Sequence, residues 1–448
     1  MSDISYPNGA HAQKSLLVQD ARTRKRNAAE ERFRRMGLVA VTIGILALVG
    51  LLSSIIANGA SSFRQTFVNL EVYLDPAKLD KAGDRDPAKM AKVTTFGYSP
   101  LLGRALAQTI EAQGISTEGV SKKEIEALLS KEAPATLRDM VLANPALVGQ
   151  TISLQVLAQG RIDGYFKGRV TMESAELDRN ISPAQLELAD ALRAAGIIDL
   201  RFNWGFFTAP DASDTRPEAA GLGVAILGSA YMMLIVLCLS LPIGVAASIY
   251  LEEFAPQNKW TDLIEVNISN LAAVPSIVFG ILGLAIFINF VGLPQSAPIV
   301  GGLVLTLMTL PTIIIATRAA LKAVPPSIRD AALGVGASKM QSVFHHVLPL
   351  AMPGILTGTI IGLAQALGET APLLLIGMVA FVREYPGSPP EGLMDPASAL
   401  PVQVYNWTTR GDPAFVERAS GAIIVLLCFL VIMNIAAIML RRRFERRW

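Results

Sequence analysis

Long apolar runs alternate with polar segments along this chain. Six of the runs are long enough to cross the hydrocarbon core of a membrane, which takes about 20 helical residues. They cover residues 36–57, 222–250, 264–290, 298–317, 353–378 and 422–440. The pattern therefore predicts six transmembrane helices, and this even number places both ends of the chain on one side of the membrane.

The segment between the first two runs, residues 58–218, has the composition of a soluble protein and is called the inserted domain below. Its polar and apolar positions predict several helices whose starts and stops carry capping signals. The starts are Ser99, Ser121 and Ser182, and the stops are Gly114 and Gly196. Residues 155–170 contain three glycines and are predicted to be strand or irregular. No nucleophile elbow or metal-ligand spacing occurs here, so a scaffold or docking role is expected.

These patterns predict an all-α membrane protein with six transmembrane helices and an α-rich soluble domain outside the cytoplasm. The expected divisions are a cytoplasmic tail at 1–35, a first transmembrane helix at 36–57, the inserted domain at 58–218 and a five-helix core at 219–448. The first run exceeds the length of a signal-peptide core, and about 35 mainly hydrophilic residues precede it. It is therefore interpreted as a retained membrane anchor.

Composition supports a membrane protein and excludes several other classes. Of the 448 residues, 52% are hydrophobic and 17% are charged, against about 25% charged in soluble domains. A net charge of +2 is too small to favour nucleic acid as a partner. Cys238 and Cys428 lie inside apolar runs and are predicted to be buried. The three histidines lack zinc-ligand spacing, so no metal site is expected.

Basic residues flank the first and last apolar runs. They are Arg22, Arg24, Lys25, Arg26, Arg32, Arg34, Arg35, Arg441, Arg442, Arg443, Arg446 and Arg447. Because cytoplasmic flanks carry an excess of Lys and Arg, both termini are predicted to be cytoplasmic. The loop at 252–262 fits this topology poorly, because Lys259 is its only cation.

A P-loop is absent, because the sequence contains no Gly-Lys pair. Any ATP on which the protein depends must therefore be hydrolysed by another chain. No catalytic residue is expected in this one.

The loop at residues 324–349 carries the most specific motif, VPPSIRDAALGVGASKMQSVFHHVLP. Its two adjacent prolines are expected to stop the incoming helix, and Ser327 is expected to cap a short one. Glycines 334 and 336 then predict a tight turn before a second helix that ends at Pro349.

This stretch, called the EAA-like loop below, resembles the EAA loop of bacterial ABC importer permeases. The matching positions are Asp330, Ala331, Ala332, Gly336, Leu348 and Pro349. Two positions depart, because Asp330 replaces the family's Glu and His346 replaces its Ile. In that family the loop docks into a groove on a cytoplasmic ATPase, so the resemblance implies the permease fold and such a partner.

The fifth run combines a small-residue face with a carboxylate. Small residues recur every four positions, which gives a flat helix face for close packing. They are Gly354, Gly358, Gly362 and Ala366. Gln365 and Glu369 lie one turn apart, and Pro372 leaves the carbonyl of Gly368 without its usual partner. The helix should therefore be weakened beside the carboxylate.

An ionisable group inside a membrane marks a transport pathway by default. Glu369 could instead pair with a neighbouring helix or a partner subunit. A carboxylate also disfavours an anionic substrate, unless it shares a proton with that substrate or is paired with a cation. The residues alone therefore leave the substrate open.

The run Gly368-Glu369-Thr370-Ala371-Pro372-Leu373-Leu374, with the stretches at 249–255 and 274–280, is similar to the PstA-type permeases of high-affinity phosphate ABC importers. The resemblance implies a translocation pathway beside Gln365, Gly368, Glu369, Thr370 and Pro372. Family members commonly have Arg at the position of Gln365, which suggests that a partner permease supplies the cation for phosphate.

The same resemblance implies the partners and location. They are a PstC-type permease, a dimer of a PstB-type ATPase that holds ATP and Mg, a periplasmic PstS-type phosphate-binding protein, inorganic phosphate and the lipids of the bacterial inner membrane. No cofactor is expected on this chain. The alternatives are a permease for another oxyanion, such as molybdate or sulfate, and a membrane receptor that senses through the inserted domain.

Overall fold

The computed structural model describes residues 21–378 and 381–444, apart from the side chains at 440 and 444. Contacts divide the chain into a unit that ends at Ile55 and a unit that starts at Ile56. Helix α1 (Ala21–Gly59) provides the described part of the first unit and contains the predicted first span. It also includes residues 21–35, for which a polar tail was expected. Arg446 and Arg447 of the predicted basic flanks lie outside the described residues.

Among the described residues, five helices are long and apolar enough to cross a membrane. They are α1, α11 (Gly223–Ile249), α14 (Pro298–Lys322), α17 (Leu348–Gly368) and α20 (Pro413–Phe444). Four of them, α1, α11, α14 and α20, correspond to predicted apolar runs, whereas α17 ends at Gly368 and covers only the first part of the run at 353–378. The last helix begins at Pro413, well before the predicted start at residue 422. The all-α membrane fold is therefore confirmed.

The predicted span at 264–290 is wrong as a single straight helix. Its residues belong to α12 (Lys259–Ala272) and to α13 (Ser276–Gly283) with the π-helical extension η5 (Leu284–Phe290). The two parts are bent by 100° relative to each other. Pro275 separates them, because proline lacks an N–H and disfavours helical conformation at the residue before it. A sixth crossing is present only if this bent pair is counted as one span.

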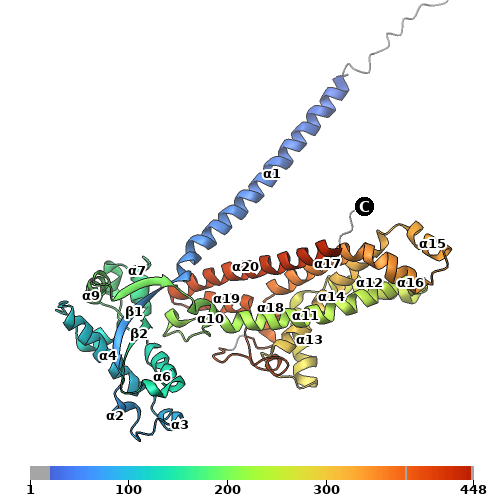
Figure 1. Cartoon of the computed structure of the whole chain (residues 1–448). Helices are drawn as coiled ribbons and strands as arrows, with labels where there is room; N and C mark the ends of the chain where they lie inside the picture. The colour runs from blue at the N-terminus through green and yellow to red at the C-terminus, as the bar shows by residue number, and fades with distance from the viewer. Residues whose placement is uncertain (1–20, 379–380, 445–448) are drawn as a thin grey trace, which may run out of the picture. The chain divides into compact units, whose positions relative to one another are not determined.

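The helices of the membrane core pack around α14, which contacts α11 and α17, while α17 also contacts α20 (Figure 1). Met232 of α11, Val304 of α14 and Leu363 of α17 are buried together between these helices. The predicted burial of the two cysteines is wrong. Cys238 and Cys428 are exposed, because each occupies a face of its helix that the rest of the described chain leaves uncovered.

A three-stranded antiparallel sheet in the order β2-β1-β3 lies in the inserted domain. The strands are β1 (Arg64–Tyr73), β2 (Thr151–Leu157) and β3 (Ile198–Phe202). Val68, Leu70 and Val72 of β1 are buried at alternate positions, so one face of the sheet lies on the domain core. Leu70 faces Leu154 of β2. The sequence analysis anticipated a strand only from residue 155, and the two other strands were missed.

Helices make up most of the remaining inserted domain. They are α2 (Pro76–Leu79), α3 (Pro87–Met90), α4 (Thr95–Ala112), α5 (Lys122–Glu126), α6 (Ala133–Ala143), α7 (Gly160–Phe166), α8 (Met172–Leu177) and α9 (Pro183–Ala194). Gly114 and Gly196 follow α4 and α9 with φ of +61° and +76°, so both predicted stops are confirmed. Residues 160–166, within the segment at 155–170 that was predicted to be strand or irregular, form helix α7.

Two of the three predicted helix starts are confirmed. Ser121 caps α5 and Ser182 caps α9, each with the reciprocal side-chain and backbone bonds of a capping box. The start at Ser99 is wrong, because α4 begins after Thr94 and contains Pro100. Pro100 lies in the second turn of α4 and removes only the backbone hydrogen bond to the carbonyl of Phe96. Phe96 is exposed to solvent, at the start of the helix.

The segment that precedes α20 packs against α20 and α11. It contains α19 (Leu400–Thr409), and α10 (Gly205–Thr208) lies beside it at the start of α11. Trp407 of α19 is fully buried near Phe206 and Phe415, with ring centroids 6.1 and 6.4 Å away. Its indole N–H donates to Oδ1 of Asp211 at 2.8 Å. This cluster fixes the entry into α11 and α20.

A buried ion-pair network joins the inserted domain to α20. Nζ of Lys167 lies 2.7 Å from Oδ2 of Asp163 and 3.1 Å from Oε1 of Glu417. Arg169 pairs with the same Glu417. The side chains of Lys167 and Glu417 are only 3% and 5% exposed. The inserted domain is therefore held to the last span by charges as well as by the chain itself.

Arg418, the next residue of α20, extends this network to the segment that precedes α11. Its guanidinium donates to the backbone carbonyls of Glu218 and Ala220 at 2.7 and 2.6 Å. Oγ of Ser130 donates to the carboxyl of Glu218 at 2.5 Å. Burial raises the pKa of Glu218 above its ordinary value.

Candidate functional site

The first part of the EAA-like loop is helix α15 (Pro326–Gly334). Pro326 is its first residue and Pro325 occupies the cap position, so the predicted cap at Ser327 is wrong. Proline is favoured at the first position of a helix, because the N–H group that it lacks would have no acceptor within the helix. This preference explains why α15 starts at Pro326. Gly336 has φ +90° and makes the predicted turn, whereas Gly334 remains in the helix.

The second helix of the loop does not end at Pro349. Helix α16 (Lys339–Ser342) continues through a π-helical turn, η6 (Val343–Val347), directly into α17. A wider π turn accommodates the missing N–H of Pro349, which would break an ordinary helix. The loop is therefore continuous with a membrane-spanning helix, and a push on the loop would move that helix.

The residues of the EAA-like loop divide between a buried and an exposed face. Ala332, Val343 and Val347 are buried against the core, whereas Asp330 and Ala331 are exposed. His346 is exposed as well, whereas the neighbouring Val343 and Val347 belong to a buried apolar cluster. Three apolar side chains add to the exposed face. They are Leu333, Val335 and Met340, which are 49%, 87% and 59% exposed.

The EAA-like loop is anchored by an arginine that the sequence analysis did not select. Arg329 donates from Nη2 to Oε1 of Glu253 at 2.7 Å and to the carbonyl of Leu321 at 2.9 Å. Its Nη1 donates to the carbonyl of Val324 at 2.8 Å. One side chain therefore ties α15 to the end of α14 and to the π-helical turn η4 (Tyr250–Phe254).

Ion pairs account for the glutamates of the loop at 252–262, which fitted the predicted topology poorly. Glu252 lies 3.4 Å from Arg318 and 3.5 Å from Lys322, and Arg318 also pairs with Glu265 at 2.5 Å. Glu252 is therefore paired with cations of α14, and Glu253 with Arg329 of α15. The adjacent pair Glu252-Glu253 at the start of the loop was the signal that could have suggested these pairings.

Replacing Arg329 with alanine should loosen the loop. The change leaves the largely buried Glu253 without its partner and removes the side-chain donor to the carbonyls of Leu321 and Val324, which should cost about 1–3 kcal/mol. We expect a lower unfolding temperature in detergent and faster proteolysis within 324–349. Lys322→Ala is the matched control, because an exposed pair contributes about 0–1 kcal/mol. Equal effects of the two variants would contradict this anchoring role.

The small-residue face of α17 packs closely against α14, as predicted. A Cβ added at Gly354 would lie 2.6 Å from Cβ of Ala320, and one at Gly358 would lie 2.2 Å from Cβ of Ala316. Both distances are shorter than carbon atoms tolerate. The glycines therefore set the distance between the two helices.

The predicted weakening beside Glu369 is a complete break. Helix α17 ends at Gly368, Glu369 has extended backbone angles (φ −79°, ψ 128°), and α18 (Ala371–Leu375) starts after Thr370. Gln365 is exposed and Glu369 is half-buried. Among the described residues, neither side chain has a hydrogen-bond or ion-pair partner. A Cβ at Gly368 would meet open space, so this chain does not cover the face around the break.

Two of the stretches that carry the resemblance meet at this break. A Cβ on Gly280 of α13 would lie 2.6 Å from Cα of Pro372. The 274–280 stretch therefore packs on the run from Gly368 to Leu374. The third stretch, at 249–255, lies at the EAA-like loop, where Glu253 binds Arg329. The structure thus collects the motifs into two places, the loop and the break in the fifth span.

Comparisons with known proteins identify the family of this chain. Residues 240–448 match the family "Binding-protein-dependent transport system inner membrane component", and residues 20–176 match a "Domain of unknown function (DUF3333)". A probable ABC transporter permease protein, YqgI of Bacillus subtilis, is 33% identical over 230 residues, which cover 49% of this chain and 78% of the relative.

Other relatives are named as phosphate permeases. The phosphate transport system permease protein PstA 2 of Mycobacterium tuberculosis is 32% identical over 251 residues, covering 55% of this chain and 79% of the relative. The PstA protein of Xylella fastidiosa is 30% identical over 220 residues, covering 49% and 74%. Among solved structures, the inward-facing MetNI methionine ABC transporter has a TM-score of 0.39 and 17% identity, covering 50% of this chain and 95% of that chain. The sequence matches show that the chain belongs to the family of inner-membrane permease components of binding-protein-dependent ABC transporters.

Proposed function

We propose that this chain is one of the two permease subunits of an ATP-driven, high-affinity importer of inorganic phosphate. The observation that carries the proposal is the break in the fifth span, where the run from Gly368 to Leu374 packs on Gly280. It supports phosphate as cargo because both stretches are similar to PstA-type permeases. Relatives named for phosphate transport are 30–32% identical to this chain over 220–251 residues.

The exposed surface of the EAA-like loop supports a separate ATPase as the partner that drives transport. Asp330, Ala331, Leu333 and Val335 offer one charge and an apolar patch to such a partner. Two PstB-type ATPase subunits would hold ATP and Mg, and this chain would make or break no covalent bond. Because α16 is continuous with α17, closure of the ATPase dimer would move the span that ends at Gly368.

The uncovered face around Gln365 and Glu369 supports a second permease subunit of the PstC type. Such a subunit would complete the pathway and supply the cation that phosphate requires, because Glu369 brings a carboxylate to this face and no described cation pairs with it. A periplasmic PstS-type protein would deliver the phosphate. The basic flanks support cytoplasmic termini, which would place the inserted domain on the outer side of the membrane.

Competition during uptake tests the proposed cargo. Cells that express the complete importer should take up ³²P-phosphate, and a hundredfold excess of unlabelled phosphate should abolish that uptake. The same excess of molybdate or sulfate should leave most of it. Stronger inhibition by molybdate or sulfate than by phosphate would show that the importer carries another oxyanion.

Glu369→Gln should reduce uptake without preventing assembly. The substitution keeps the size of the side chain and removes the charge that would pair with a cation of the second permease. A coupling of about 1.4 kcal/mol corresponds to a tenfold change, so we expect uptake to fall about tenfold. Glu391→Gln in an exposed loop is the control. Unchanged uptake by Glu369→Gln would contradict a role for this carboxylate in the pathway.

A further inference from the structure

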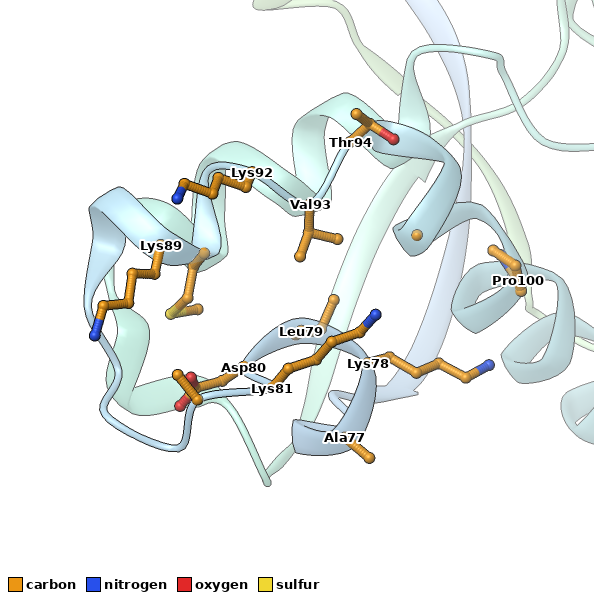
Figure 2. Close-up of a pocket in the computed structure, with 13 residues that line it drawn as sticks. Ala77, Lys78, Leu79, Asp80, Lys81, Lys89, Lys92, Val93, Thr94 and Pro100 are labelled. Carbon is orange, nitrogen blue, oxygen red and sulfur yellow. The ribbon is translucent and has the colours of Figure 1, made fainter.

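The inserted domain contains a pocket of about 640 Å³ that the transport function does not use. It lies between α2, the turn that leads to α3, and the start of α4. Lys78 and Lys81 lie on one side of it and Lys89 and Lys92 on the other, with Leu79 and Val93 between them (Figure 2). Its volume falls in the range of about 300–1,000 Å³ that is typical of small-molecule sites.

The charge around the pocket is strongly positive. Asp80 also lines it, but its carboxylate accepts hydrogen bonds from the backbone N–H groups of Gly83 and Arg85 at 2.9 and 3.0 Å. Asp84 pairs with Lys89. Within residues 21–378 and 381–444, no carboxylate lies at ion-pair distance from the other three lysines. Lys78, Lys81 and Lys92 therefore present three uncompensated ammonium groups.

The floor of the pocket is apolar. Leu79 and Met90 are buried beneath it, and Val93 and Pro100 complete this surface. An apolar floor beneath a cationic rim suits a molecule with an anionic group and an organic body. Inorganic phosphate would use only the rim, whereas a phosphate ester would use both.

We propose that this pocket binds a phosphate monoester, with the phosphoryl group among Lys78, Lys81 and Lys92 and the organic part on Leu79 and Val93. A phosphoryl group carries about −1.5 to −2 charges at pH 7, which matches three cations better than a single carboxylate does. Lysine binds phosphate as a point charge and needs no fixed geometry. The site lies outside the span break, so it does not depend on the cargo proposed above.

Calorimetric titration of the full-length chain in detergent tests the site. The probes are phenyl phosphate as a soluble ester, dihexanoyl phosphatidic acid as a lipid headgroup, and inorganic phosphate. One ester should bind saturably, at least tenfold more tightly than inorganic phosphate, and the tighter of the two identifies the source. Raising the salt from 50 to 500 mM should weaken binding, because exposed charges are screened.

Variants connect the binding to the pocket. Lys78→Ala/Lys81→Ala/Lys92→Ala should weaken ester binding at least tenfold, whereas Lys122→Ala/Lys123→Ala should leave it unchanged, because these exposed lysines belong to α5. Lys81→Glu is a single change that should weaken it as well, should the triple variant prove unstable. Ester binding that is absent, or equal in the pocket and control variants, would overturn the proposal. Tighter binding of a polyglutamate peptide than of either ester would do so too.

Discussion

Replacing Gly358 with leucine should prevent the membrane core from folding stably. A Cβ at this position would already lie 2.2 Å from Cβ of Ala316, and the backbone of Ala316 lies only 3.6 Å away. Leucine adds three further carbons to this contact. Overpacking of this kind costs about 1–3 kcal/mol and sometimes more, and here α14 and α17 would have to separate.

The measurement is the amount and the unfolding temperature of the purified chain in detergent. We expect little or no monodisperse protein for Gly358→Leu, and a milder loss for Gly358→Ala. Gly44→Leu is the control, because a side chain at Gly44 of α1 meets no atom within 4 Å. A normal yield and unfolding temperature for Gly358→Leu would mean that α14 and α17 do not pack along this face.

Lys167→Met should have a comparably large effect, because it opens the buried network between the inserted domain and α20. Lys167 lies between two carboxylates, Asp163 and Glu417, and all three side chains are at most 5% exposed. Removing one member of a buried ion pair costs about 3–5 kcal/mol, because the remaining charge is left without compensation. Arg169, which also contacts Glu417, should reduce this cost but not eliminate it.

The double variant Lys167→Met/Glu417→Gln makes the test specific. If the loss comes from an uncompensated carboxylate, Glu417→Gln should restore part of the unfolding temperature in the Lys167→Met background. Lys122→Met, at an exposed position of α5, should change little. A cycle in which the two substitutions are simply additive would show that Lys167 and Glu417 do not interact.

Local signals in the sequence were sufficient for several elements that depend on short-range chemistry, although the predicted starts at Ser99 and Ser327 were wrong. The capping boxes at Ser121 and Ser182 and the glycines at 114 and 196 each act within a few residues, and all four were placed correctly. The glycine face of α17 was also predictable, because its four-residue spacing directly describes one side of a helix.

Features that depend on distant partners were not predictable from the same patterns. Strand β1 pairs with two segments that lie far along the chain, so its alternation of Val68, Leu70 and Val72 had no local confirmation. The bend at Pro275 was missed because residues 264–290 were predicted to form a single span. The extension of α16 through Pro349 was missed because the π turn that permits it has no sequence signature.

The candidate site likewise combines features that have a local signal in the sequence with features that depend on distant partners. A weakened helix beside Glu369 followed from Pro372, whereas the complete break and the new helix α18 did not. The anchoring of the EAA-like loop by Arg329 could not be foreseen, because its acceptors lie on η4, α14 and the turn after α14. Only folding brings these groups together.

Uptake of ³²P-phosphate at submicromolar concentration tests the central claim most directly, in a bacterial strain that lacks this chain but retains the proposed partner subunits. We expect high-affinity uptake to be lost in that strain. Reintroducing the wild-type chain should restore it, and reintroducing Asp330→Arg, which reverses the charge on the exposed face of the EAA-like loop, should not. Undiminished high-affinity phosphate uptake in the strain without the chain would contradict the account.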